Sequence, residues 1–126
     1  YVSVSTVKAW LADDKPVTLL DVREPDEFAA AHLPHARNIH YDHVVSIVSE
    51  LPNDQPIVLY CIHSAHRAPE AVKVLRQLGF DNAYVLEGGI VAWQAGGQTI
   101  LASNPSQTAT ILPKTERCAT LQHSSN

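Results

Sequence analysis

The chain has 126 residues, of which 45% are hydrophobic and 17% charged, so it is long enough for one globular domain and too apolar to be disordered. Its net charge is −4 and it contains no block of basic residues, which argues against a nucleic-acid footprint or a patch for an anionic membrane. No apolar stretch approaches the roughly 20 residues that a membrane-spanning helix needs, and no signal peptide is visible, so we expect a cytoplasmic protein.

Short apolar runs alternate with amphipathic segments along the first three quarters of the chain. Ser5 is a suitable N-cap for a first helix over 6–11. Further helices are predicted over 25–31, 44–51, 68–78 and 90–95, and strands over 17–22, 36–39, 57–61 and 83–86. Strands that alternate with helices are typical of an α/β domain with a mainly parallel sheet.

The composition changes near Gly96 and Gly97. From Gln98 onward the chain is rich in Ser, Thr, Gln and Asn and carries only isolated apolar pairs. We therefore expect one domain over 1–97 and a polar C-terminal extension over 98–126, which packs on the domain or on a neighbouring molecule.

The clearest strand ends at Cys61, and the clearest helix begins just after Arg67. In an open parallel sheet, ligands bind outside the carboxyl ends of the strands, where loops lead into helix N-termini. Backbone N–H groups and the helix dipole would favour an anion there, so we expect the pKa of the Cys61 thiol to fall below its ordinary value of about 8.5. An inert core cysteine is the alternative. The residues predicted to bind substrate are those of the loop, namely Ile62, His63, Ser64, Ala65, His66 and Arg67.

Three segments together carry a family pattern. They are LDVREPDEF at 20–28, HLPHA at 32–36 and LEGGIVAW at 86–93, and Cys61 lies between the second and the third. In this order and spacing they resemble the rhodanese (sulfurtransferase) superfamily, and the resemblance extends from Val4 to Gly96. It implies a rhodanese-like α/β fold, in which a five-stranded, mainly parallel sheet has helices on both faces.

The resemblance also implies an enzyme of the thiosulfate sulfurtransferase type, with Cys61 as the catalytic nucleophile. A small anionic donor such as thiosulfate would leave a persulfide on Cys61, and cyanide, a small thiol or a protein cysteine would accept the sulfur. No organic cofactor is expected, because the sequence has no glycine-rich nucleotide motif. The oligomeric state stays open.

The loop departs from the usual sulfurtransferase pattern. Five residues separate Cys61 from Arg67, one more than in most such members, and none of them is glycine. This spacing resembles that of the phosphatase and arsenate-reductase branches, in which the arginine grips two oxygens of an oxyanion. Oxyanion chemistry is therefore the alternative function. The third is a non-catalytic rhodanese-like interaction module, although a module of that kind would need neither Cys61 nor Arg67.

Several residues near the predicted site are expected to have structural roles. Asp21 and Arg23 form a charged pair at the end of a buried strand and should tie neighbouring loops together. Gly88 and Gly89 should permit a tight strand-to-helix turn beside the loop. The family usually has glycine where this chain has Ala31 and His35; both substitutions are tolerable if the local φ is negative, so they put the turn geometry in question rather than the fold.

Six of the seven histidines form His-x-x-His pairs, at 32/35, 40/43 and 63/66. We expect no metal site, because a coordinated Cys61 thiolate would lose its nucleophilicity, and we expect His63 and His66 to tune the loop electrostatically. The second cysteine, Cys118, lies in the polar extension and is expected to be a bystander rather than a thiol that resolves the Cys61 adduct.

Overall fold

The computed structural model describes residues 1–112, which are built around a four-stranded, fully parallel sheet with the strand order β2-β1-β3-β4. The strands are β1 (Thr18–Asp21), β2 (Arg37–Asn38), β3 (Ile57–Tyr60) and β4 (Ala83–Val85). The two central strands, β1 and β3, pair over their whole length, from Thr18 with Ile57 to Asp21 with Tyr60. All four residues of β3 are buried, as expected for a strand that is covered on both faces.

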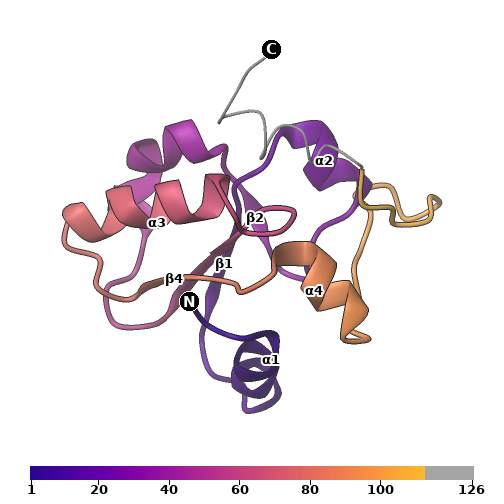
Figure 1. Ribbon diagram of the computed structural model, residues 1–126, viewed down its shortest axis with the longest axis horizontal. Helices are drawn as coiled ribbons and strands as arrows, with labels where there is room; N and C mark the ends of the chain where they lie inside the picture. The colour runs from indigo at the N-terminus through magenta and orange to yellow at the C-terminus, as the bar shows by residue number, and fades with distance from the viewer. Residues whose placement is uncertain (113–126) are drawn as a thin grey trace.

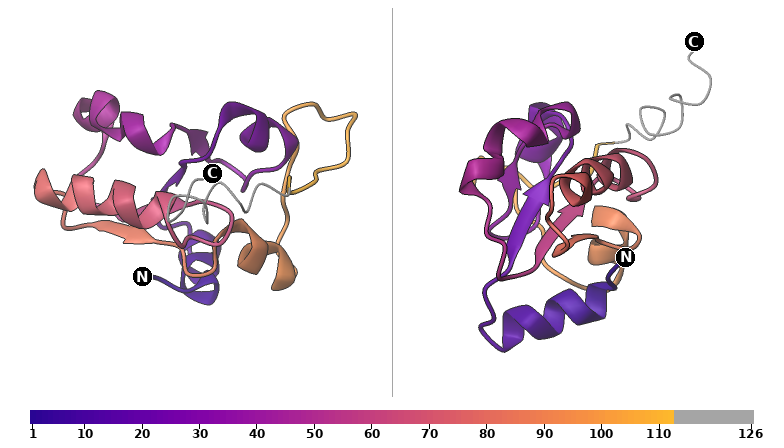
Figure 2. Two further views of the ribbon diagram at one scale, coloured as in Figure 1. Left: turned by 45° about the horizontal axis from the view of Figure 1, so that its top comes forward. Right: turned by 90° about the vertical axis from the view of Figure 1, so that its left-hand side faces the viewer.

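Helices cover both faces of this sheet (Figures 1 and 2). One face packs against α3 (Arg67–Gln77) and the 3-10 helix η1 (Tyr41–Glu50), in a core that includes Leu20 and Leu59. The other face packs against α1 (Val4–Ala12) and α4 (Gly89–Ala95), in a second core that includes Leu19 and Val58. The remaining helix, α2 (Pro25–Ala30), follows the carboxyl end of β1. Neighbouring residues of one strand thus belong to different cores because strand side chains alternate in direction.

The predicted α/β fold with a parallel sheet is confirmed, but the strand count is four rather than five. The fifth strand is reduced to a single parallel bridge between Val2 and Leu86. Pairing stops there because Ser3 begins the first helix: its Oγ accepts a hydrogen bond from the Thr6 N–H at 3.1 Å. The cap is therefore Ser3, and the prediction of Ser5 was wrong by two residues. The segment expected to be helical over 44–51 is present as the 3-10 helix η1.

Residues beyond Gly97 contact the domain as far as the structure describes them. His32 and Leu101 form an antiparallel bridge, and the Ser103 and Thr110 N–H groups donate to the carbonyls of Ala29 and Ala30. These two carbonyls belong to the last turn of α2, which has no further turn of helix to satisfy them. Residues 98–112 therefore close the C-terminal end of α2.

The α-helices of residues 1–112 are short, and the longest, α3, has 11 residues. None of the described helices combines the length and the apolar character that crossing a bilayer requires.

Candidate active site

All four parallel strands end at the same edge of the sheet, and the predicted site residues gather there. Cys61 follows β3 directly, and the loop after it leads into α3 at Arg67. The start of α2 follows β1 at the same edge, and the start of α4 follows β4. Three connections that are distant in sequence therefore meet at the edge where Cys61 lies.

The first turn of α4 holds the beginning of the Cys61 loop. The Ile90 N–H donates to the Cys61 carbonyl at 3.1 Å, and the Val91 N–H donates to the Ile62 carbonyl at 3.2 Å. Gly89 makes this approach possible, because a Cβ at its position would overlap both of these carbonyl oxygens. Its φ of +64° is a second reason for glycine at this position.

Gly88, the neighbouring residue, also has a conformation that favours glycine. Its φ is +77°, and a Cβ there would lie 2.5 Å from the Cβ of Ala92. The two glycines thus form the tight turn from β4 into α4, directly beside the loop.

The loop encloses the cysteine. Cys61 has no exposed surface and Ile62 is 1% exposed, whereas His63 and Ala65 are exposed and His66 is half-buried. The Cys61 N–H donates to Ser64 Oγ at 3.5 Å, and Ser64 is itself buried with a φ of +56°. The candidate nucleophile therefore lies beneath its own loop, and the two exposed residues form the outer surface.

His66 occupies the N-cap position of α3, but its side chain makes no capping hydrogen bond. The first N–H groups of a helix have no intrahelical partner, and the helix dipole makes this end positive. The end of α3 that faces the loop thus offers donors and positive potential to an anion.

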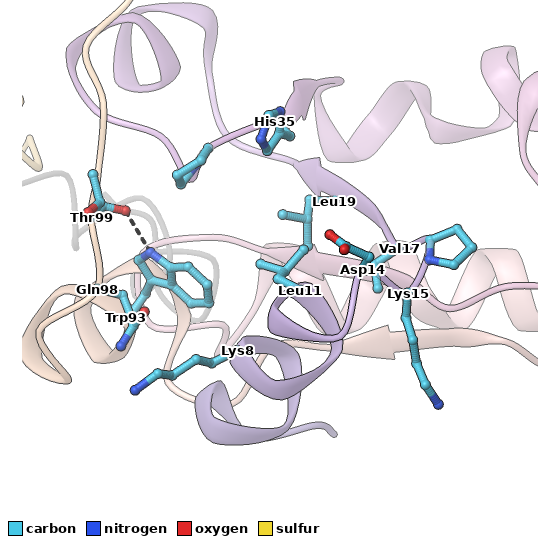
Figure 3. A pocket seen from close by; sticks show the side chains of 12 residues that line it. Lys8, Leu11, Asp14, Lys15, Val17, Leu19, His35, Trp93, Gln98 and Thr99 are labelled. Atoms are coloured by element: carbon cyan, nitrogen blue, oxygen red, sulfur yellow. Dashed lines mark hydrogen bonds between the residues drawn. The ribbon is translucent and has the colours of Figure 1, made fainter.

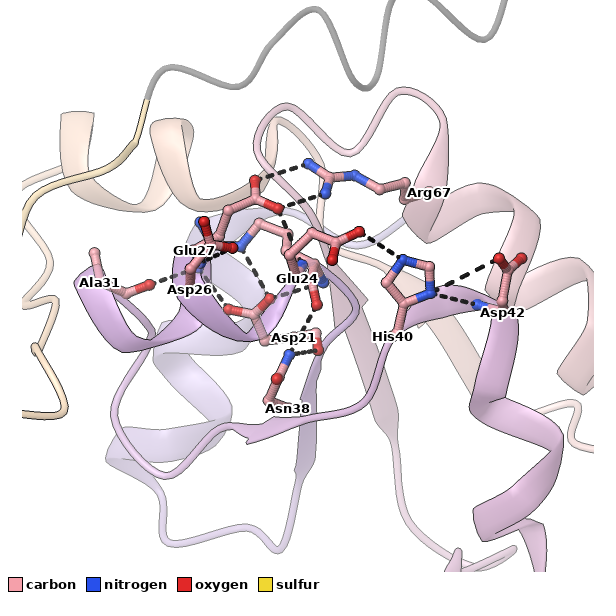
Figure 4. Close-up of polar contacts among 10 residues, drawn as sticks. Asp21, Glu24, Asp26, Glu27, Ala31, Asn38, His40, Asp42 and Arg67 are labelled. Carbon is pink, nitrogen blue, oxygen red and sulfur yellow. Dashed lines mark hydrogen bonds and ion pairs between the residues drawn. The ribbon is translucent and has the colours of Figure 1, made fainter.

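Arg67 forms a buried ion pair with Glu27 of α2 (Figure 4). Its Nη1 donates to Glu27 Oε1 at 2.7 Å and its Nη2 donates to Oε2 at 3.1 Å. Burial alone would raise the pKa of Glu27, but the hydrogen bonds from Arg67 outweigh it and hold this pKa below its ordinary value. The terminal nitrogens of Arg67, which would have to bind two oxygens of an oxyanion, already bind the Glu27 carboxylate. This contact weakens the oxyanion alternative.

Asp21 and Arg23 lie at the carboxyl end of β1 and are fully buried. Arg23 Nε donates to Asp21 Oδ1 at 2.9 Å, and its Nη2 donates to Oδ2 at 2.6 Å and to the Ala31 carbonyl. Burial lowers the pKa of Arg23, but the hydrogen bond and the charge of Asp21 raise it by more. The pKa is therefore above its ordinary value, and the guanidinium stays charged. Asn38 adds two hydrogen bonds, to the carbonyls of Asp21 and Arg23. The pair thus joins β1, β2 and the end of α2.

Two polar residues of this region were missed by the sequence analysis as parts of the site. Glu27 belongs to a capping box at the start of α2, together with Glu24, and the spacing of these two acids after a strand was the available signal. Tyr60 was predicted only as part of the strand over 57–61, yet its hydroxyl accepts a hydrogen bond from the Leu33 N–H at 3.0 Å. Its phenol is buried, which, with the nearby Asp21 charge, raises its pKa well above the ordinary value of 10.0.

The condition of a negative φ, under which the replacement of glycine is tolerable, is met at Ala31 and not at His35. Ala31 is extended, with a φ of −166°, but His35 has a φ of +66°. The turn before β2 therefore keeps the left-handed geometry that glycine would favour, although a histidine stands there.

The histidine pairs make local contacts. The His32 ring stacks on Phe28 with 4.1 Å between ring centres, and its Nδ1 lies 2.8 Å from the Phe28 carbonyl. His40 Nε2 lies 3.0 Å from Glu24 Oε2 (Figure 4). Across residues 1–112, no three His, Cys, Asp or Glu side chains come together as a set of metal ligands. Cys118 lies outside the described residues.

A doubly covered parallel sheet, with a cysteine loop at the carboxyl end of its central strand, defines the class of rhodanese-like α/β domains. The family model for the rhodanese-like domain matches residues 3–96, and the chain belongs to this family. Two curated relatives are a sulfurtransferase of Allochromatium vinosum and the thiosulfate sulfurtransferase GlpE of Pseudoalteromonas translucida. The first is 37% identical, and the match covers 73% of this chain and 85% of the relative. The second is 31% identical, and the match covers 68% of this chain and 80% of the relative.

Solved structures have the same fold. The rhodanese-like domain of an Anabaena protein is 27% identical with a TM-score of 0.75, and the match covers 86% of this chain and 83% of that one. A rhodanese-related protein of Thermoplasma volcanium is 28% identical with a TM-score of 0.69, and the match covers 79% and 95% of the two chains. The chain is thus a rhodanese-type domain with sulfurtransferases among its relatives.

Proposed function

We propose that this chain is a sulfurtransferase that carries sulfane sulfur as a persulfide on Cys61. The observation that carries the proposal is the position of Cys61, at the carboxyl end of the central strand, with its carbonyl held by α4 and with α3 beginning at Arg67. The relatives named as sulfurtransferases support the reaction class, and the one named as a thiosulfate sulfurtransferase supports thiosulfate as a donor.

The reaction consists of two displacements at sulfur. Cys61 first loses its proton to solvent, and its thiolate attacks the outer sulfur of thiosulfate. The S–S bond of the donor breaks, sulfite leaves with the bonding electron pair, and Cys61 holds a persulfide. Cyanide, a small thiolate or a protein cysteine then attacks the outer sulfur, and the Cys61 thiolate departs. Two covalent half-reactions predict ping-pong kinetics.

The loop supplies the electrostatics of both steps. The thiolate, the arriving dianion and the terminal persulfide sulfur are all negatively charged. The N-terminal end of α3, where no side chain makes a capping hydrogen bond, presents N–H donors and the positive potential of the helix dipole to them. His63, which is exposed, and His66, which is half-buried, are the side chains proposed to tune this loop electrostatically. In this proposal Arg67 acts indirectly, since its guanidinium holds the loop to Glu27.

Cys61 has to become accessible for this chemistry, because its exposed fraction is zero. We propose that the outer part of the loop, His63 to His66, moves away to admit the donor. The loop begins at two carbonyls held by α4 and ends at the ion pair of Arg67, so only the segment between these two anchors needs to move.

The full burial of Cys61 favours one competing function, a rhodanese-like module that binds a partner without catalysis. The two functions differ in whether the thiol reacts in the folded protein. In Cys118→Ser, which leaves Cys61 as the single thiol, the folded protein should react slowly but completely with a small thiol reagent if the loop opens, and only after unfolding if Cys61 is an inert core residue.

The decisive experiment is the intact mass of the full chain after incubation with thiosulfate. We expect a gain of about one sulfur atom, lost on addition of cyanide, in the parent protein and in Cys118→Ser, and no gain in Cys61→Ser. Cys118→Ser is the matched control because it removes the only other cysteine. Absence of an adduct on reduced, folded protein would refute transfer from thiosulfate, and arsenate and aryl phosphates would be assayed next.

A further inference from the structure

A hollow that includes no residue of the Cys61 loop lies between α1 and α4, the two helices that cover one face of the sheet (Figure 3). Its volume is about 550 Å³, within the range of roughly 300–1,000 Å³ that is usual for small-molecule sites. Its walls come from α1, the turn into β1, the turn before β2, α4 and the first residues after α4. Val17 of the lining comes just before Thr18, which pairs with Ile57 of β3. Ile57 lies four residues before Cys61, which corresponds to about 13 Å along the strand.

The floor of this hollow is apolar. Leu11 of α1, Leu19 of β1 and Trp93 of α4 line it, and the last two are each 3% exposed. The Trp93 ring is fixed, because its indole N–H donates to the Thr99 carbonyl at 2.8 Å. A planar or branched apolar group would therefore meet a preformed surface.

The polar groups of the rim are arranged unequally. Lys8 and Gln98 lie on the Trp93 side of Leu11, and Asp14 lies on the opposite side (Figure 3). Lys15 follows Asp14 and lies at the same end, so these two charges offset one another there. Lys8 has no carboxylate of the lining beside it, and an anionic head group therefore finds its complement beside Trp93, at Lys8 and Gln98.

His35 supplies an independent argument. Its φ of +66° is a conformation that glycine adopts without a steric penalty and other residues adopt only with strain. The backbone at this turn thus favours glycine, yet the residue present has an imidazole ring that lines the hollow opposite Lys8. A non-glycine residue in this conformation is uncommon, and here it places an imidazole ring at the rim of the hollow.

We propose that this hollow binds a small organic anion, with its carboxylate or sulfonate at Lys8 and Gln98 and its apolar body on Leu11, Leu19 and Trp93 beneath His35. The site is separate from the Cys61 loop, so ligand binding and persulfide formation can be measured independently.

The test compares three probes that differ only in their head group: 3-phenylpropionate, 3-phenylpropan-1-ol and 3-phenylpropylamine. Each is titrated into the full ¹⁵N-labelled chain, and the indole N–H resonance of Trp93 is followed, with Trp10→Phe to assign it. We expect a saturable shift with 3-phenylpropionate, with a Kd on the order of 1 mM, and weaker binding of the alcohol and the amine. No saturable shift, or tightest binding of the amine, would overturn the proposal.

Two variants locate the ligand. Lys8→Gln should weaken binding of the carboxylate by about three- to fivefold and leave the alcohol unchanged, whereas Lys73→Gln on α3 should change neither. His35→Gly should weaken all binding while it raises the Tm by a few degrees, because it removes both the ring and the strain. A higher Tm with unchanged affinity in His35→Gly would show that His35 has no part in binding. Equal effects of Lys8→Gln and Lys73→Gln on carboxylate binding would contradict the proposal that the anionic group binds at Lys8.

Discussion

Glu27 and Arg67 are 40 residues apart in the sequence, yet their side chains form a two-point ion pair that is almost completely buried. Glu27 lies in the first turn of α2, and Arg67 is the residue at which the Cys61 loop becomes α3. The pair therefore couples the conformation of the loop to the position of α2. If Cys61 is the nucleophile, as proposed, Glu27 is a positioning residue that acts on the loop through Arg67 without contact with the reacting atoms.

Glu27→Gln should destabilise the protein strongly. Removal of one partner from a buried ion pair leaves the other charge uncompensated, so we expect the free energy of unfolding to fall by about 3–5 kcal/mol in urea titrations. Glu50→Gln is the matched control, because the Glu50–Arg37 pair is about half exposed and should contribute about 1 kcal/mol or less. Equal effects of the two substitutions would contradict the importance of the Glu27–Arg67 pair. Slower persulfide formation in Glu27→Gln, with the folded fraction held constant, would show the effect on the loop.

The same ion pair predicts how stability depends on acid pH. The folded-state pKa of Glu27 lies below its ordinary value of 4.5, so the stabilisation is fully present above about pH 4.5 and is lost as the pH falls through the folded-state value. We expect the urea midpoint to drop steeply below pH 4.5 in the parent protein and less steeply in Glu27→Gln. Identical slopes below pH 4.5 would rule out a contribution from this carboxylate.

Gly89→Ala should disrupt the support of the loop by α4. The new Cβ would overlap the carbonyl oxygens of Cys61 and Ile62 at a φ of +64°, so we expect a loss of at least about 3 kcal/mol and a loss of persulfide formation. Gly97→Ala is the control, since Gly97 also has a positive φ, of +83°, but a Cβ there would meet nothing within 4 Å. It should lose only about 1 kcal/mol from backbone strain and keep its activity. Comparable losses in both variants would mean that backbone strain, and not contact with the loop, explains the requirement for glycine.

Tyr60→Phe should lower the free energy of unfolding at neutral pH and change how that free energy depends on pH in the alkaline range. The substitution leaves the buried Leu33 N–H without its acceptor, which should lower the free energy of unfolding by about 1–3 kcal/mol. Because the folded-state pKa of Tyr60 is raised above 10.0, the parent protein should lose stability as the pH rises past about 10, where the unfolded phenol ionises.

The alkaline loss of stability should be smaller in Tyr60→Phe and unchanged in Tyr84→Phe, which leaves the buried phenol in place. Chemical denaturation between pH 8 and pH 11 measures both slopes. A parent-like slope in Tyr60→Phe would assign the alkaline transition to other groups.

Much of the fold was predictable, because apolar runs and punctuating residues act locally. The runs before Asp21 and Cys61 predicted the two central strands, and Gly79, with a φ of +98°, follows α3 as a helix-ending glycine. The fifth strand was not predictable, because whether Val2 forms a strand or a single bridge depends on where Ser3 begins the first helix. Local patterns cannot decide such competition between neighbouring elements.

The candidate site was predictable in its position and only partly in its contacts. The order of strand, Cys61 and helix placed the cysteine at the carboxyl edge of the sheet, since parallel strands end together. The partner of Arg67 was not predictable, and the guanidinium expected to bind an oxyanion holds Glu27 instead. The sequence also left the turn geometry at His35 open, and the structure gives it a positive φ, because the turn before β2 imposes its geometry on the residue that occupies it.

By itself, the sequence determined the class of fold and the family and pointed to Cys61 as the candidate nucleophile, because hydrophobic periodicity and short motifs are properties of neighbouring residues. Only the tertiary structure decided which charges pair, how deeply Cys61 is enclosed and that a hollow lies beneath His35. These properties depend on residues tens of positions apart that meet when four parallel strands bring their ends to one edge, and no local pattern records such meetings.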